Sequence, residues 1–298
     1  MKSNRTYIIL GIIFICLCLV VVAVIVGFNL IQNRPPSSLS NSGYYVRGST
    51  IYYHPGFGLS EPFEVTEADR DSFVILDGRY ALDESHVFYG GVPIPDADPS
   101  TFELLESPFS RDAKHVYASG DIFSDDPANF ERLSENISRD SQHIYWSGNV
   151  ISDDPSNLVI IWDQNYYTYL KDLNTVFVNG NPIQDADIAT FEVIMDGYAR
   201  DESHIFYFGE IIHGADSTTF EVLESPYARD AESIFWMENI IPDADPNTFR
   251  ILNANFECSA DSESAYYQDQ LIPNFDPTTI PTTSQVTNCD INGMYFSP

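Results

Sequence analysis

Basic residues are scarce in this 298-residue chain, in which 14 Lys and Arg stand against 44 Asp and Glu for a formal net charge of -30. Lysine occurs only at Lys2, Lys114 and Lys171. A surface that binds nucleic-acid phosphates needs clustered Lys and Arg. We therefore expect no nucleic-acid partner.

Catalytic signatures are also missing from the sequence. It contains no Gly-x-Ser-x-Gly elbow, no His-Glu-x-x-His helix and no phosphate-binding loop. Carboxylates are so numerous that some pair falls at glycosidase spacing by chance, which makes such a pair uninformative. The sequence assigns no catalytic residue and favours a protein that is not an enzyme.

Cysteine is rare, with 4 in the chain. Cys16 and Cys18 lie in an apolar run, so Cys258 and Cys289 are the thiols that an oxidising compartment would act on. A disulfide between them would close a loop of about 30 residues, worth about 3–4 kcal/mol in the chain-entropy model. The alternative is two unpaired cysteines.

The apolar run covers residues 7–31, and no charge stands between Thr6 and Asn33. At about 1.5 Å per residue it spans a hydrocarbon layer of about 30 Å. A cleaved signal peptide is the alternative, but its apolar region is usually about 7–15 residues. Lys2 and Arg5 precede the run, which places residues 1–6 in the cytoplasm and the rest outside. We expect a single-pass signal-anchor in the cell membrane, followed by a Pro- and Ser-rich linker over 32–43.

Aromatic residues make up 14% of the chain and hydrophobic residues 44%, a composition that favours β-sheets and argues against disorder. A short phrase repeats from residue 44 to 280: an Asp, then four residues on an aliphatic followed by aromatics. We call these Asp residues the anchor aspartates; their spacing is about 29 residues. They are Asp83, Asp112, Asp140, Asp172, Asp201, Asp230 and Asp261, with Arg47 in the place of an eighth.

Each repeat predicts three short strands, such as 87–89, 92–94 and 102–105, with Gly in the hairpin turn and an Asp-Ala-Asp-Pro turn after it. One unit cannot bury its aromatic face alone, so neighbours must stack. The prediction is an all-β array of about eight repeats, elongated or curved, over 44–280, with a C-terminal tail over 281–298. A β-propeller is the alternative, although its blades usually have four strands and about 40 residues.

The Asp-x-x-x-Val/Ile-Phe/Tyr-Tyr phrase, its Gly-bearing turn and the Ala-Asp-Pro-x-Thr-Phe segment resemble the DKNYY family of bacterial repeat proteins. The resemblance covers about 70–280 well and 44–69 weakly. It implies a repeat architecture and a bacterial envelope setting, and it implies no catalytic residue. The sequence departs from the family at the residue after each anchor, where Lys is expected and where Glu84, Ala113, Ser141, Leu173, Glu202, Ala231 and Ser262 stand.

Paired aspartates recur in the turns and are the candidates for a metal site. Two carboxylates and nearby carbonyls suit a weak calcium site, whereas an alternative reading has these aspartates capping turn N–H groups. The residues concerned are Asp96, Asp98, Asp185, Asp187, Asp243 and Asp245. Calcium is the one cofactor that the sequence suggests.

Aromatic residues in an insertion between two repeats are the candidates for ligand contact. Trp162, Tyr166 and Tyr167 lie where the repeat does not explain them, and they could stack on sugar rings. The histidines at 86, 115, 143 and 204 follow anchors by three residues, at places that elsewhere hold Thr or Ser. Such places are polar turn positions and not zinc ligands, because zinc needs three or four ligands about 2 Å from one ion.

The sequence therefore predicts a membrane-anchored extracytoplasmic repeat protein that acts as a non-catalytic binding or interaction module at the cell envelope. Its partner would be an envelope protein or a glycan. Two alternatives remain open at this point. One is a hydrolase of envelope carbohydrate that uses unidentified Asp or Glu residues, and the other is a structural spacer.

Overall fold

The computed structural model describes residues 43–56, 61–164, 167–281 and 285–297. The chain divides into two compact units, Met1–Phe130 and Glu131–Pro298, which we call the N-terminal and C-terminal units. Within the described ranges no helix is long and apolar enough to cross a membrane. The predicted anchor at 7–31 and the linker up to residue 42 lie outside those ranges.

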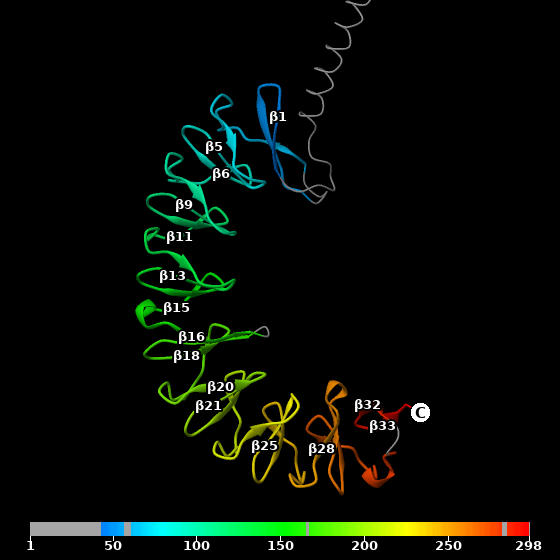
Figure 1. The fold of residues 1–298 in the computed structure, drawn as a ribbon. Coiled ribbons are helices and arrows are strands. Elements are labelled where there is room, and N and C mark those ends of the chain that lie inside the picture. Colours follow the sequence, from blue (N-terminus) through cyan, green and yellow to red (C-terminus); the bar gives the residue numbers. More distant parts are fainter. Residues whose placement is uncertain (1–42, 57–60, 165–166, 282–284, 298) are drawn as a thin grey trace, which may run out of the picture. The chain divides into compact units, whose positions relative to one another are not determined.

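The N-terminal unit is built from small antiparallel sheets that follow one another along the chain (Figure 1). The first has three strands, β1 (Gly43–Arg47), β2 (Thr50–His54) and β3 (Phe63–Glu64). The second has four, β4 (Val74–Ile75), β5 (Tyr80–Leu82), β6 (Val87–Tyr89) and β7 (Val92–Pro93). The third also has four, β8 (Glu103–Leu104), β9 (Phe109–Arg111), β10 (Val116–Ala118) and β11 (Asp121–Ser124).

The C-terminal unit continues the pattern with five four-stranded sheets and a final hairpin among its described residues. The first three sheets comprise β12 (Glu131–Arg132), β13 (Ile137–Arg139), β14 (Ile144–Trp146) and β15 (Asn149–Ser152); β16 (Val159–Gln164), β17 (Tyr167–Lys171), β18 (Val176–Val178) and β19 (Asn181–Pro182); and β20 (Glu192–Met195), β21 (Tyr198–Arg200), β22 (Ile205–Tyr207) and β23 (Glu210–Ile211). The remaining strands are β24 (Glu221–Val222), β25 (Tyr227–Arg229), β26 (Ile234–Trp236) and β27 (Asn239–Ile240); β28 (Arg250–Asn253), β29 (Cys258–Ala260), β30 (Ala265–Tyr267) and β31 (Gln270–Leu271); and the hairpin β32 (Val286–Asp290) and β33 (Gly293–Phe296). Three 3₁₀ turns complete this unit: η1 (Pro155–Asn157), η2 (Ala254–Phe256) and η3 (Pro277–Thr279).

The fold is all-β with repeated small antiparallel sheets, as predicted, but the prediction of three strands per repeat is wrong. Each complete sheet has four strands, because the segment before an anchor aspartate is itself a strand. In the β8–β11 sheet, Phe109 to Arg111 pair with Ala118 to Val116, and Leu104 pairs with Ser110. In the sequence, the Ser and Pro before Phe109 indicate a loop. The residues that follow them nevertheless form a strand, because they are hydrogen-bonded to the next strand, β10. The described strands close no barrel.

Glycine in the hairpin turns lets an aromatic ring of the preceding sheet approach the backbone. At Gly180, which has a φ of 77°, an added Cβ would lie 2.3 Å from Cγ of Trp146. Gly120 repeats this arrangement, with an added Cβ 2.8 Å from Cβ of Tyr89. A side chain at either position would displace the ring, so these turns favour glycine for close packing as well as for positive φ.

The core of the C-terminal unit is a chain of apolar clusters, each shared by two consecutive sheets. One cluster contains Tyr169 and Val176 of the β16–β19 sheet together with Ala199 and Phe206 of the β20–β23 sheet. The hydroxyl of Tyr169 also donates to the carbonyl of Gly197, at 2.8 Å. Each sheet therefore buries its rings against the next, which is the stacking that a short repeat requires.

The turn after the β16–β19 sheet is fastened to the sheets on both sides of it. After β19, the Nζ of Lys171 donates to the carbonyl of Ile188 at 2.8 Å, which ties the turn to the β16–β19 sheet. The backbone N–H of Asp187 donates to Oδ2 of Asp201 at 2.8 Å, which ties the same turn to the β20–β23 sheet. Because the two bonds come from opposite sides, the turn acts as a clamp between sheets.

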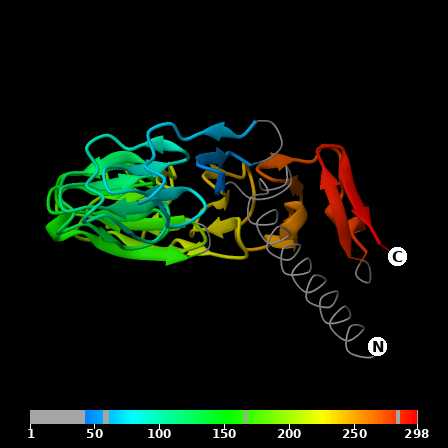
Figure 2. The same ribbon diagram turned by 90° about the horizontal axis from the view of Figure 1, so that it is seen from above.

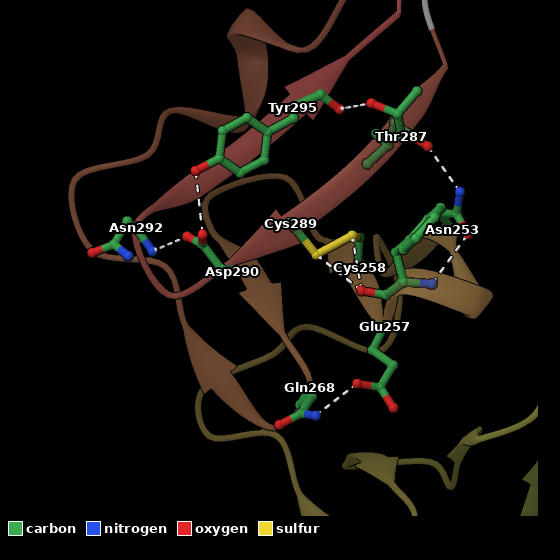
Figure 3. Close-up of a disulfide and its surroundings, with 11 residues drawn as sticks. Asn253, Glu257, Cys258, Gln268, Thr287, Cys289, Asp290, Asn292 and Tyr295 are labelled. Atoms are coloured by element: carbon green, nitrogen blue, oxygen red, sulfur yellow. Dashed lines mark hydrogen bonds between the residues drawn. A yellow bond between two sulfur atoms is a disulfide. The ribbon is translucent and has the colours of Figure 1, made fainter.

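The segment after residue 280, which the sequence presented as a tail, contains the β32–β33 hairpin. Figure 2 shows this hairpin, coloured red, beside the orange β28–β31 sheet. Cys258 of β29 and Cys289 of β32 form a disulfide with a Cα–Cα distance of 5.9 Å (Figure 3). Asn253 supports the joint, because its Nδ2 donates to the carbonyl of Val286 at 2.8 Å.

Candidate functional site

The anchor aspartates are the most regular polar feature of the described chain, and all of them are buried. Asp201 shows the geometry that it shares with Asp83, Asp112, Asp230 and Asp261, whereas at Asp172 the hydroxyl of Ser152 donates to Oδ2 in place of the turn N–H. The Oδ1 of Asp201 accepts the N–H groups of Ser203 and His204 at 2.8 and 2.6 Å, and its Oδ2 accepts the N–H of Asp187 at 2.8 Å. The carboxylate therefore closes the turn between the second and third strands and holds the turn of the preceding repeat.

These bonds set the acidity of the anchor aspartates. Burial alone raises the pKa of Asp201, but the backbone N–H groups of Asp187, Ser203 and His204 outweigh burial and hold it below the ordinary value of an aspartate. The same causes lower the pKa of Asp83, Asp112 and Asp261. The charged form is the one that the fold stabilises, so these carboxylates serve as structural acceptors.

In three repeats a tyrosine adds a further bond to its anchor. The hydroxyl of Tyr117 donates to Oδ2 of Asp112 at 2.8 Å, and Tyr266 donates to Asp261 at the same distance. Tyr145 repeats this bond with Asp140. The equivalent places in the other repeats hold phenylalanine: Phe88, Phe177, Phe206 and Phe235. The repeats therefore tolerate either ring, provided that the anchor is present.

The two aspartates of each pair have different roles in their turn. Asp96, Asp185 and Asp243, the first of each pair, are exposed and have φ values of 61°, 57° and 60°, a region that Asp adopts more readily than most residues. Asp98, Asp187 and Asp245, the second of each pair, accept the N–H two residues on at 3.0, 2.9 and 3.0 Å. The second carboxylate is thus a turn cap. In the described ranges no group of three or more His, Cys, Asp or Glu could hold a metal ion.

Four histidines lie beside the anchors, as their spacing predicts. In the β8–β11 sheet, Nδ1 of His115 lies 3.4 Å from the hydroxyl of Tyr117, and its Nε2 lies 3.6 Å from Oδ1 of Asp125. His143 repeats this arrangement with Tyr145 and Asp153 in the next sheet. Each histidine thus contacts residues of its own repeat.

Two of the aromatic residues predicted to contact a ligand, Trp162 and Tyr167, form part of the sheet framework. The insertion lengthens the β16–β17 hairpin, in which Trp162 pairs with Tyr169. Trp162 and Tyr167 stack with ring centroids 6.1 Å apart, and Tyr167 is only 4% exposed. Tyr166 lies outside the described residues. The structure thus places Trp162 at the edge of the core and Tyr167 inside it, which leaves Tyr167 little surface for a ligand.

Two hollows open among the described residues of the N-terminal unit. The larger includes Asp96 and Asp98, which the sequence named as candidate metal ligands, whereas the smaller includes no residue that the sequence singled out. The smaller, of about 350 Å³, lies between the β4–β7 and β8–β11 sheets, and Asp77, Arg79, Tyr89, Leu104 and Phe109 are among its lining residues. The larger, of about 670 Å³, is lined by Glu67, His86, Asp96, Asp98 and Lys114, among others. Each hollow combines residues from adjacent repeats, so no single sequence motif predicts it.

The fold and these carboxylate networks define a class: a tandem β-repeat protein whose recurring aspartates fasten one small sheet to the next. The DKNYY family matches residues 11–121, 109–239 and 227–295. The chain belongs to the DKNYY family. No curated protein and no solved structure matches it.

Proposed function

We propose that this chain is a membrane-anchored extracytoplasmic repeat protein that acts as a non-catalytic binding module at the cell envelope. The apolar run at 7–31 supports the anchor, with residues 1–6 in the cytoplasm and the repeats outside. Four short strands in a repeat of about 29 residues, fewer than the about 40 residues usual for a propeller blade, favour an elongated or curved array of stacked sheets. The partner is an envelope protein or glycan.

The observation that carries the proposal is a row of exposed aliphatic side chains on the fourth strands of the sheets. In the C-terminal unit, Val150, Ile240 and Leu271 are each 41–52% exposed. They hold equivalent places, because each pairs with the central aromatic of the third strand, as Ile240 does with Phe235. We call these three residues the outer-strand row.

About half of each side chain in the outer-strand row is exposed to solvent. Repeated surfaces of this kind give a protein many equivalent contacts along an extended partner. Exposed apolar groups bordered by polar residues are typical of interaction sites. An exposed carboxylate follows two members of the row by three residues, Asp153 after Val150 and Asp243 after Ile240. The row therefore suits binding better than a purely mechanical spacer.

The test is capture of a saturable partner by the full chain from envelope membranes after chemical crosslinking. The variant carries Val150→Ser, Ile240→Ser and Leu271→Ser, and the control carries Val74→Ser, Ile75→Ser and Val159→Ser, which are exposed to a similar extent on first strands. We expect the first variant to lose the partner and the control to retain it. Equal capture by both would contradict the role of the row. Turnover of glycosides or peptidoglycan by the full chain would show that the protein is a hydrolase and not a non-catalytic binding module.

A further inference from the structure

The smaller hollow of the N-terminal unit has the composition of a sugar-binding site. Its volume of about 350 Å³ falls at the low end of the about 300–1,000 Å³ typical of small-molecule sites. One wall is apolar, formed by Leu104, Pro108, Phe109 and Tyr89. The lining also has a polar part, which includes Asp77 and Arg79. A hollow of this size suits one or two pyranose rings and excludes a folded segment of protein.

Arg79 is the unusual cation of this region. At the strand pairs of other sheets, Arg111, Arg200 and Arg229 are each bonded to a glutamate. Arg79 has no carboxylate within 4.0 Å among the described residues, and its Nη1 donates to the hydroxyl of Tyr89 at 3.2 Å. A guanidinium has five N–H donors in a fixed fork, so most of its donors remain for a ligand.

Asp77 supplies an acceptor beside this guanidinium. Its Oδ1 accepts the N–H groups of Arg79 and Tyr80 at 2.7 and 2.6 Å, which fixes the orientation of the carboxylate. No described residue donates to Oδ2. The site therefore offers donors and an acceptor that are held in place by one turn, an arrangement that needs little reordering on binding.

We propose that this hollow binds a neutral pyranose ring that carries adjacent hydroxyl groups. Each hydroxyl both donates and accepts, so one can accept from Arg79 while its neighbour donates to Oδ2 of Asp77. The C–H groups of the ring pack on the wall formed by Leu104, Pro108, Phe109 and Tyr89. Asp77 and the formal charge of -30 disfavour acidic sugars. This inference rests on the proposed binding function and names one ligand class for it.

The test is saturation-transfer NMR titration of the full chain, in a detergent without a sugar head group, with β-1,4-linked tetramers of glucose and of N-acetylglucosamine. We expect one of these neutral probes to bind and Arg79→Gln to weaken it at least 10-fold. Arg47→Gln, which removes the same charge from an exposed position outside the hollow, leaves the affinity unchanged. A trigalacturonate probe binds more weakly than the neutral ones.

A second pair of variants tests the position of the site. Leu104→Trp fills the hollow and abolishes binding, whereas Ile75→Trp, at the equivalent place in the β4–β7 sheet, does not. No binding of either neutral tetramer, or binding that both Arg79→Gln and Leu104→Trp retain, overturns the inference. So does tighter binding of trigalacturonate. Capture of an envelope partner that survives Leu104→Trp while both tetramers fail would refute this site and leave the proposed function standing.

Discussion

The middle and the end of the C-terminal unit solve the same packing problem with different chemistry. In the β20–β23 and β24–β27 sheets, Tyr198 and Tyr227 stand at the start of the second strand and are fully buried. In the β28–β31 sheet the same place holds Cys258, which is bonded to Cys289 of the final hairpin. A ring needs a following sheet to cover it, and the β28–β31 sheet is followed by a two-stranded hairpin instead. A covalent bond thus replaces ring packing where the repeat gives way to the hairpin.

Removing a buried ring from the middle should have the largest effect. Tyr198→Ala is expected to lower the free energy of unfolding by about 3–5 kcal/mol, because its ring is fully buried and its hydroxyl donates to the carbonyl of Pro226 at 2.7 Å. Urea denaturation measures the loss, and hydrogen exchange should place it in β20 to β27. Tyr295→Ala, at a residue 49% exposed, should cost less than about 0.5 kcal/mol. Similar losses for the two variants would contradict the comparison.

Breaking the disulfide should be the matching experiment at the end of the unit. Replacing Cys258 and Cys289 by Ser removes a cross-link with a sequence separation of 31 residues, at an expected cost of about 3–4 kcal/mol. Hydrogen exchange should accelerate in β28 to β33 and remain unchanged in β20 to β23. Free thiols in protein from the native host would show that the bond does not form there.

In the middle of the C-terminal unit, an anchor aspartate should stabilise the fold through its negative charge. Asp201→Asn keeps one oxygen acceptor but turns an amide N–H toward the N–H of Asp187, and it should cost about 2 kcal/mol. Asp230→Asn should cost a similar amount, because the N–H of Asp216 meets Oδ2 of Asp230 in the same way. Denaturant titration at neutral pH measures both losses.

The pH dependence of stability gives the direction of the charge effect at Asp201. Because folding lowers the pKa of Asp201, its contribution is complete above the unfolded value of about 3.9 and is lost as the pH falls through the lower folded value. The wild-type chain should therefore lose stability on acidification below about pH 4, and the Asp201→Asn profile should be shallower. Parallel profiles for the two proteins would exclude a charge effect at this position.

Removing a single hydroxyl group should have a smaller effect. It also makes the β28–β31 sheet resemble the sheets in the middle of the unit. Tyr266→Phe removes the 2.8 Å bond to Asp261 and reproduces the phenylalanine of Phe235. The expected loss is about 1 kcal/mol, since Asp261 keeps its bonds to backbone N–H groups. Thermal unfolding measures it, with Tyr267→Phe as a control that should change nothing. No loss for Tyr266→Phe would show that the phenol bond is neutral.

Calcium should have no measurable effect on either region. The second aspartate of each pair already accepts turn N–H groups, as Asp187 and Asp245 do, so we expect the melting temperature to be the same with millimolar calcium and with chelator. A rise in melting temperature with calcium would show a site that binds the folded chain. Asp243→Asn would then locate it.

Sequence reasoning predicted the all-β repeats, the hairpin turns and the pairing of Cys258 with Cys289, because each of these follows from a local pattern or from a short list of residues. It missed the second strand of each sheet, such as Phe109 to Arg111, because three residues after a proline carry too little alternation to indicate a strand. Tertiary pairing, and not local propensity, decides such a segment.

The candidate sites were harder to predict, for a different reason. Trp162 and Tyr167 looked exceptional because an insertion separated them from the repeat, yet the insertion only lengthens β16 and β17. The smaller hollow combines Arg79 of one sheet with Leu104 and Phe109 of the next. A site assembled from two repeats depends on how they pack, which a pattern along one chain does not contain.

The clamped turns have a mechanical consequence. The turn after β19 is held by Lys171 on one side and by Asp201 on the other, so a pulling force along the polypeptide meets resistance from both at once. Once a clamp opens, the force falls on the buried rings that the sheet shares with its neighbour, and loss of that packing lets the small sheet unravel as a piece. A protein stretched between a bilayer and a distant attachment would lengthen in even steps, each of about 29 residues and on the order of 100 Å.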